Sequence, residues 1–295
     1  MRDRFTAVTG ELLDTDPRAA LVFADTGLDR FAPAGILERH PHRAINVGIR
    51  EQLMVGVAAG LALEGYRPIA HSYAPFLIER AFEQVKLDLG HQGVGAVLVS
   101  TGASYDAADS GRTHHAPGDV SLMATLPGWE IHVPGHADEV EWAMRRAMTI
   151  DSPVYIRLSE AANRDAHARA LNGSMVVRES SPTAPLVIAV GPMLDRVLDS
   201  TQGRDVTVAY TATVAPLDLG SIRGWGATDV AIVEPTLEGT SLPGLSTALS
   251  DMPRRFLGIG VSKTELRCYG TPAQHDAAYG LDPGGIRKRL EAFWS

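Results

Sequence analysis

Several features that would narrow the function of a protein are scarce or missing in this sequence of 295 residues. A single cysteine, Cys268, excludes an internal disulfide and a cysteine-based metal cluster. No stretch reaches the roughly 18–20 uninterrupted apolar residues that a membrane-spanning helix needs, and no apolar signal core follows Met1–Phe5. The net charge of −8 includes no basic stripe, which argues against a nucleic acid or an anionic membrane as partner. These absences predict a soluble, cytoplasmic protein.

The chain has enough apolar sequence to fold, since hydrophobic residues make up 45% of it, and its length indicates about two domains. Short apolar runs, typical of strands covered on both faces, alternate with amphipathic helical segments. This alternation predicts an α/β fold of two domains, each a mostly parallel sheet flanked by helices. The expected strands are Ala20–Ala24, Ala96–Ser100, Glu130–Val133, Val154–Arg157, Leu186–Val190, Val206–Tyr210, Val230–Val233 and Phe256–Ile259, and the expected helices include Ile49–Leu63, Phe76–Leu89, Ala137–Thr149, Met193–Ser200 and Gly285–Phe293.

One stretch breaks the alternation of strands and helices. Residues Glu160–Pro185 are mainly polar, and the run Ser180–Pro185 is typical of a linker. We therefore expect a first domain over residues 1–180, linker included, and a second domain over residues 181–295.

The most informative run is Asn46–Gln52, which places one carboxylate, Glu51, in the first turn of a helix rich in small residues. An acidic side chain there can simply stabilise the helix dipole. Short side chains farther along, at Gly56–Leu63, would also let another backbone or a cofactor approach closely. The run alone leaves both interpretations open.

Polar and aromatic residues also follow several expected strands, where ligands gather in open α/β sheets. His114 and His115 lie in a polar loop, and adjacent histidines rarely bind one metal ion together. A hydrogen-bonding or proton-transfer role fits a histidine in a cleft, while capping of the helix near Gly118 is the structural alternative. Tyr73 and Phe76 could pack in the core or stack on a ligand.

Taken in order, these segments resemble the pyrimidine-binding half of thiamine-diphosphate enzymes of the transketolase family, including the 1-deoxyxylulose-5-phosphate synthases. The resemblance is close over residues 18–158 and looser from residue 185 to the end, where it is to the C-terminal domain of that family. The segments that carry it are Ala24-Asp25, Asn46–Gln52, Gly60–Ala62, Phe76–Gln84, Gly111–His115, Asp119, Leu126–Trp129, Ala189–Gly191, Pro216–Asp218 and Val233–Pro235.

The resemblance implies a role for Glu51, which would hydrogen-bond a ring nitrogen of the cofactor's aminopyrimidine. A carboxyl group kept away from water has a raised pKa and can supply a proton there. By the same matching Phe76 would stack on the pyrimidine, with Tyr73 and Arg80 lining its pocket, although Arg80 could instead pair with a neighbouring glutamate. His114 would be catalytic and would face substrate oxygens.

The other substrate contacts that the resemblance implies are Asp109, His71 and Arg157. Asp109 departs from the family pattern, because the family commonly spaces its aspartate and histidine four residues apart, whereas Asp109 and His114 are five apart. No residue of this chain is expected to bind metal.

Complete members of the family hold the diphosphate and its divalent ion through a Gly-Asp-Gly signature followed by an asparagine, and this sequence has no such signature. The resemblance therefore implies the C-terminal subunit of a split transketolase. Thiamine diphosphate would be shared with a separate N-terminal subunit, which would also bind Mg²⁺ or a similar ion. We expect two copies of each subunit in a heterotetramer, with the second domain mainly supporting the dimer; His275 and Glu234 are only weak catalytic candidates there.

The sequence departs from the family where a sugar phosphate would bind. Glu160 lies where transketolases usually carry an arginine, and Ser100–Gly102 lacks the arginine of the deoxyxylulose synthases. Because a glutamate repels phosphate, we hypothesise a donor without a terminal phosphate, or a phosphate held by other residues.

Three functions are compatible with this resemblance. The first is transfer of a two-carbon ketol unit from a ketose-like donor to an aldehyde acceptor, in carbohydrate metabolism or a specialised pathway. The second is the β subunit of a 2-oxo acid dehydrogenase or decarboxylase, which has a similar layout. The third is a non-catalytic regulatory subunit. Gly111–His115 and Leu126–Trp129 favour the transferase.

Overall fold

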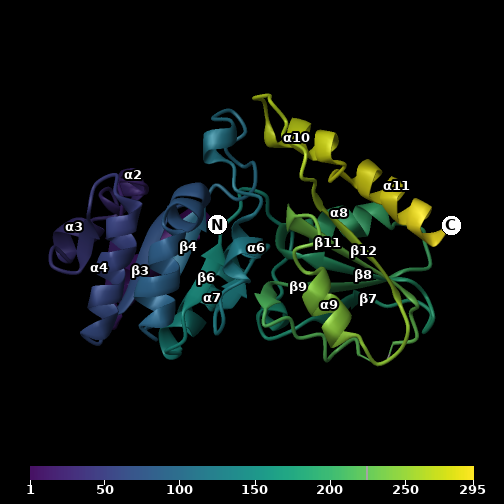
Figure 1. Ribbon diagram of the computed structural model, residues 1–295, viewed down its shortest axis with the longest axis horizontal. Helices are drawn as coiled ribbons and strands as arrows, with labels where there is room; N and C mark the ends of the chain where they lie inside the picture. The colour runs from purple at the N-terminus through teal and green to yellow at the C-terminus, as the bar shows by residue number, and fades with distance from the viewer. Residues whose placement is uncertain (224) are drawn as a thin grey trace.

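The computed structural model describes residues 1–223 and 225–295 and contains two sheets that lie side by side (Figure 1). The first has seven strands in the order β10-β5-β6-β4-β3-β1-β2, and all neighbours are parallel except β10 and β5. Its strands are β1 (Ala19–Phe23), β2 (Ala44–Asn46), β3 (Arg67–Tyr73), β4 (Val97–Thr101), β5 (Glu130–His132), β6 (Val154–Arg157) and β10 (Thr213–Ala215).

The second sheet has five strands in the order β12-β11-β8-β9-β7, parallel except for the pair β7 and β9. Its strands are β7 (Met175–Arg178), β8 (Leu186–Val190), β9 (Thr207–Thr211), β11 (Asp229–Leu237) and β12 (Arg255–Val261). Two mostly parallel sheets flanked by helices confirm the predicted fold class.

Helices cover both faces of each sheet, as the continuous apolar strands require (Figure 1). They are α1 (Arg2–Thr15), α2 (Leu28–Phe31), α3 (Ile36–Arg39), α4 (Glu51–Leu63), α5 (Phe82–Gln84), α6 (Asp119–Met123), α7 (Ala137–Thr149), α8 (Leu194–Ser200), α9 (Leu242–Ala248), α10 (Pro272–Tyr279) and α11 (Pro283–Trp294). The helix expected over Phe76–Leu89 is instead two π-helical turns, Pro75–Arg80 and Val85–His91, on either side of α5.

Two apolar layers run through the molecule, one on each face of both sheets. In β1, Leu21 and Phe23 belong to the layer that includes α1 and α7, while Val22 belongs to the layer with α4. The second sheet divides in the same way, since Val187 lies in the first layer and Ile188 in the second. Each layer contains side chains from both halves of the chain, so the two sheets share their core.

The polar stretch that breaks the alternation, Glu160–Pro185, contains a strand before the expected linker at Ser180–Pro185. Residues Met175–Arg178 form β7 at the edge of the second sheet, where they pair with β9. The strand has four residues, three apolar and one arginine, and is too short to stand out from the polar stretch around it. The domain boundary at residue 180 stays a prediction, and β7 places a strand of the second sheet before it.

Candidate functional site

Glu51 is the first residue of α4, and the turn that delivers it is built by Asn46 at the end of β2. The Asn46 side-chain oxygen accepts hydrogen bonds from the backbone N–H groups of Asp25 (3.1 Å) and Gly48 (3.0 Å). Gly48 takes a positive φ of 71°, which favours glycine and lets the chain reverse into the helix. The sequence of this run therefore fixes the position of the Glu51 backbone between two strand ends.

The Glu51 side chain is buried, at 1% exposure, and is held by one cation. Arg80 donates from Nη1 to Glu51 Oε2 at 2.8 Å, and the arginine itself is 42% exposed. Among the described residues no hydrogen bond reaches the second carboxylate oxygen, Oε1. The geometry resolves the alternative for Arg80, which pairs with Glu51 rather than with Glu79 or Glu83.

Three aromatic rings form a cluster that Arg80 joins to Glu51. The ring of His114 lies 5.2 Å from that of Phe76 and 5.5 Å from that of Tyr73, both edge to face, and the Tyr73 and Phe76 rings lie 6.1 Å apart. The guanidinium of Arg80 lies over the Phe76 ring at 4.3 Å. The structure thus brings together five residues that the sequence singled out, namely Glu51, Tyr73, Phe76, Arg80 and His114.

Three further candidate residues lie elsewhere. Asp109 is exposed, and its carboxylate accepts only the hydroxyl of Ser110 at 3.3 Å among the described residues. Arg157 is fully buried and donates from Nε to Asp119 at 2.7 Å and from Nη2 to Ser104 at 2.7 Å. These buried partners give Arg157 a structural role, and its direct contact with substrate stays a prediction.

His71 is buried beside the rings of Phe5 and Phe31. Its Nδ1 donates to the backbone carbonyl of Val99 at 2.8 Å, and burial lowers the pKa of His71 to about 4, so the ring is neutral at pH 7. The ring lines a cavity of about 160 Å³ together with Arg2, Asp25 and Tyr73. The contact of His71 with substrate stays a prediction. If it forms, His71 contacts the substrate as a neutral imidazole.

Sequence reasoning missed Asp106 and Arg2. Asp106 accepts the N–H groups of Ala103 (3.1 Å) and Glu160 (2.9 Å), and burial raises the pKa of its carboxyl to about 7. Arg2 lies 3.4 Å from Glu160 and 5.7 Å from the centre of the Tyr73 ring. No motif marks either residue, because each acquires its neighbours only when distant segments meet.

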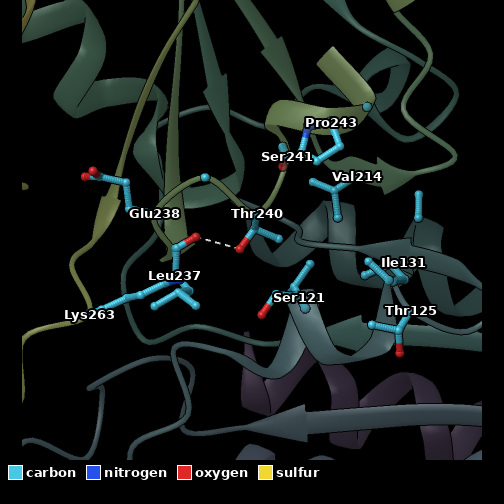
Figure 2. Close-up of a pocket in the computed structure, with 15 residues that line it drawn as sticks. Ser121, Thr125, Ile131, Val214, Leu237, Glu238, Thr240, Ser241, Pro243 and Lys263 are labelled. Atoms are coloured by element: carbon cyan, nitrogen blue, oxygen red, sulfur yellow. Dashed lines mark hydrogen bonds between the residues drawn. The ribbon is translucent and has the colours of Figure 1, made fainter. Parts of the chain in front are cut away.

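The cavity of about 520 Å³ shown in Figure 2 lies between the two domains, away from the predicted site residues. Ser121, Thr125 and Ile131 line it from the first half, and Leu237–Ser241 and Lys263 line it from the second. Glu234 lies beside it as a fully buried carboxyl that accepts Ser241 Oγ at 2.7 Å, and burial raises its pKa to about 7. These contacts hold a turn of the second domain and give Glu234 a structural role.

No helix among the described residues combines the length and the apolar character that a membrane span requires. No group of three or more His, Cys, Asp or Glu side chains in the same part of the chain lies close enough together to hold a metal ion.

Comparison with known proteins shows what class of protein this fold and site define. Residues 1–165 match the family model for the transketolase pyrimidine binding domain. The chain is 44% identical over 293 residues to an uncharacterized 33.6 kDa protein in the fasciation locus of Rhodococcoides fascians, covering 98% of this chain and 92% of that protein. It is also similar in structure to a split gene transketolase described as an inactive beta4 tetramer, with a TM-score of 0.82, 23% identity and coverage of 99% and 97%. The chain belongs to the transketolase family.

Within that family the chain has the make-up of a C-terminal-type subunit of a split transketolase, as its sequence predicted. It is 28% identical over 285 residues to the 6-deoxy-6-sulfo-D-fructose transketolase subunit SqwH of Clostridium sp. (strain MSTE9), covering 92% of this chain and 86% of that subunit. It is 31% identical over 317 residues to 1-deoxy-D-xylulose-5-phosphate synthase 2 of Geobacter sulfurreducens, covering 97% of this chain but 48% of that enzyme. The chain therefore spans about half the length of such a synthase.

Proposed function

We propose that this chain is one subunit of a thiamine-diphosphate-dependent transferase that moves a two-carbon ketol unit from a ketose-like donor to an aldehyde acceptor. The observation that carries the proposal is the buried carboxylate of Glu51 at the start of α4, with Phe76, Tyr73 and His114 gathered beside it. A carboxylate, an aromatic platform and a histidine in one place suit a heteroaromatic cofactor and an oxygen-rich substrate.

The residues present fit the pyrimidine end of the cofactor. Glu51 Oε1 has no partner among the described residues, so it can face a ring nitrogen, and the half-buried Phe76 ring offers a surface for stacking. Arg80 covers one face of that ring, so a stacked pyrimidine takes the other face or displaces the guanidinium. The Tyr73 ring lies edge to face with the Phe76 ring, 6.1 Å away.

When bound, thiamine diphosphate supplies the carbon nucleophile that attacks the donor carbonyl. The protein's part is to hold and move protons at defined atoms. Glu51 would hold a proton at the pyrimidine nitrogen when the cofactor is bound, while Arg80 donates to the Glu51 carboxylate at Oε2. His114 hydrogen-bonds substrate oxygens; its Nδ1 lies 3.0 Å from Thr113 Oγ1, which leaves Nε2 for the substrate.

A partner subunit follows from the same cofactor, because this sequence contains no Gly-Asp-Gly diphosphate signature. The surface beside Glu51 supports this inference, since Ile49 is 73% exposed and Leu53 46%. Exposed apolar side chains around a site indicate an interface. We propose that an N-terminal transketolase-type subunit covers them, binds the diphosphate with Mg²⁺ or a similar ion, and assembles with this chain as a heterotetramer.

Calorimetric titration of thiamine diphosphate with Mg²⁺ tests this proposal. The chain alone should bind the cofactor at least about a hundredfold more weakly than an equimolar mixture with its partner. The reason is that each charge-assisted hydrogen bond to the diphosphate contributes about 1.5–3 kcal/mol and comes from the partner. Equal affinity with and without the partner would contradict a shared site. Absence of binding in the mixture would favour a regulatory subunit.

The donor is proposed to lack a terminal phosphate, or to have it held by residues other than Glu160. Glu160 is 52% exposed and lies 3.4 Å from Arg2, so the positive charge of this arginine is already paired with a carboxylate. The assembled enzyme should use a free ketose at least about tenfold better, in kcat/KM, than its phosphate ester, since an unfavourable charge contact costs about 1–2 kcal/mol.

Glu160→Arg should narrow or reverse that preference, and Glu160→Gln is the matched control because it removes the charge without adding one. A wild-type enzyme that prefers the phosphate ester would contradict the hypothesis. Turnover of a 2-oxo acid without transfer to an aldehyde would favour the dehydrogenase or decarboxylase function instead.

A further inference from the structure

His114 lies in a loop that contacts the second domain on its far side. This segment, which we call the histidine loop, covers residues 102–118 between β4 and α6. Its base is closed where Ala116 N–H donates to the Ser104 carbonyl at 2.9 Å. In Figure 1 the loop rises above the first sheet next to the segment that leads into α10. The loop therefore stands between the site at Glu51 and the second domain.

The first contact is a buried hydrogen bond. Tyr105 donates its hydroxyl to Asp276 Oδ1 on α10 at 2.7 Å, and Arg196 donates to the same oxygen at 2.6 Å. Tyr105 is 8% exposed and Asp276 9%. The position of α10 is itself fixed, because Thr271 and Gln274 form a capping box at its first turn. One side of the loop is thus tied to a rigid point on the second domain.

The second contact is a stack of rings. The His275 ring lies parallel to that of Tyr105, with centres 5.4 Å apart and 22° between the planes, and perpendicular to that of His115, at 5.4 Å and 88°. His115 Nε2 lies 3.2 Å from the Ala107 carbonyl, which links the two sides of the loop. His275 therefore packs directly against the residue next to His114.

The loop is held at its ends as well. Leu237 N–H donates to the Pro117 carbonyl at 2.6 Å, and Ser104 donates its hydroxyl to the Pro235 carbonyl. Between these ends Asp109, Ser110, Arg112 and Thr113 are exposed. The tip is held on one side by the packing of His114 against Tyr73 and Phe76, and on the other by the contacts of Tyr105 and His115 with α10.

We propose that α10 positions His114 for turnover, with Asp276 and His275 acting as positioning residues that never touch the substrate. The proposal rests on the proposed function of His114. The second domain then serves the reaction and does more than support a dimer. A displacement of about 1 Å in a catalytic group can cost about a hundredfold in rate, so a tether of this kind can control turnover.

Tyr105→Phe in the full assembled enzyme tests the proposal, because it removes the hydroxyl that donates to Asp276 and keeps the ring that stacks on His275. We expect kcat to fall by about tenfold, with cofactor affinity unchanged within about twofold, because Glu51 and Phe76 stay in place. Asp276→Asn should act in the same direction, and the double variant should be no worse than the poorer single variant.

Asp282→Ala is the control for simple destabilisation of the second domain. Asp282 caps α11 by accepting the Gly285 N–H at 3.2 Å and makes no hydrogen bond to the histidine loop among the described residues. Loss of a helix cap costs about 0.5–2 kcal/mol, so Asp282→Ala should lower the melting temperature without changing kcat below that temperature. If Asp282→Ala lowers kcat as much as Tyr105→Phe does, the effect is one of stability and the proposal is wrong.

An NMR measurement decides the proposal even if the assembled enzyme shows no turnover. The ring signals of His114, assigned by their loss in His114→Gln, should shift or broaden in Tyr105→Phe and Asp276→Asn but not in Asp282→Ala. Unchanged His114 signals together with unchanged kcat would overturn the positioning role. A wild-type complex that binds no cofactor would refute the proposed function, while the NMR comparison would still report on the tether.

Discussion

Glu51→Gln should abolish turnover of the assembled enzyme while leaving the fold intact. Glutamine has nearly the same shape, so α4 should start at the same residue, but an amide cannot exchange a proton with a ring nitrogen. Loss of a positioned proton-transfer group costs about 10²–10⁴-fold in rate. The substitution also removes the charge that Arg80 contacts at 2.8 Å. The measurement is ketol transfer by the complex, with circular dichroism to confirm folding.

Glu83→Gln is the matched control for Glu51→Gln. Glu83 is an exposed glutamate on α5, close in sequence to Arg80, and no ion pair involves it among the described residues. It should retain wild-type turnover. Unchanged turnover in Glu51→Gln would rule out the catalytic role and favour a regulatory subunit.

The largest loss of stability should come from Asp119→Ala. Asp119 and Arg157 are both fully buried and pair at 2.7 Å. Asp119 also accepts the Tyr155 hydroxyl at 2.7 Å and the Val120 N–H at 2.8 Å. Its removal leaves a buried guanidinium without its counter-charge, which typically costs about 3–5 kcal/mol. Urea unfolding should show this fall in the free energy of unfolding.

Two further variants serve as comparisons for Asp119→Ala in the same unfolding measurement. The double variant Asp119→Ala with Arg157→Leu should recover part of the loss, because no charge is then buried alone. Arg255→Ala, which breaks the surface pair with Asp229 where the arginine is 59% exposed, should cost less than about 1 kcal/mol. A loss below about 1 kcal/mol for Asp119→Ala would mean that water reaches this pair.

The sequence predicted the fold well wherever a strand is a continuous apolar run. Leu186–Val190 and Val154–Arg157 were predicted with the observed bounds. Strand β3 was not predicted, because it begins with Arg67 and includes His71. These polar groups are tolerated only because carbonyls of distant residues accept their hydrogen bonds: Ala147 and Ser152 for Arg67, and Val99 for His71. Such partners are invisible in a linear pattern.

The residues of the candidate site were also predicted only in part. Glu51, Phe76, Arg80 and His114 were singled out by motifs, and they converge because their segments follow parallel strands of one sheet, β2, β3 and β4. The partners that hold His114 in place could not be predicted. His275 and Asp276 lie more than a hundred and fifty residues away in sequence, and only the meeting of the two sheets brings them to the histidine loop.

Strand β10 has a consequence for how the chain can be divided. It belongs to the later half of the sequence, yet it pairs with β5 at the edge of the first sheet. A fragment that stops at residue 180 would leave the N–H and C=O groups of β5 open to other chains, and we expect such a fragment to aggregate. Genetic recombination that replaced one half alone would have to rebuild the pairing of β10 with β5, so we expect the two halves to be inherited as a unit.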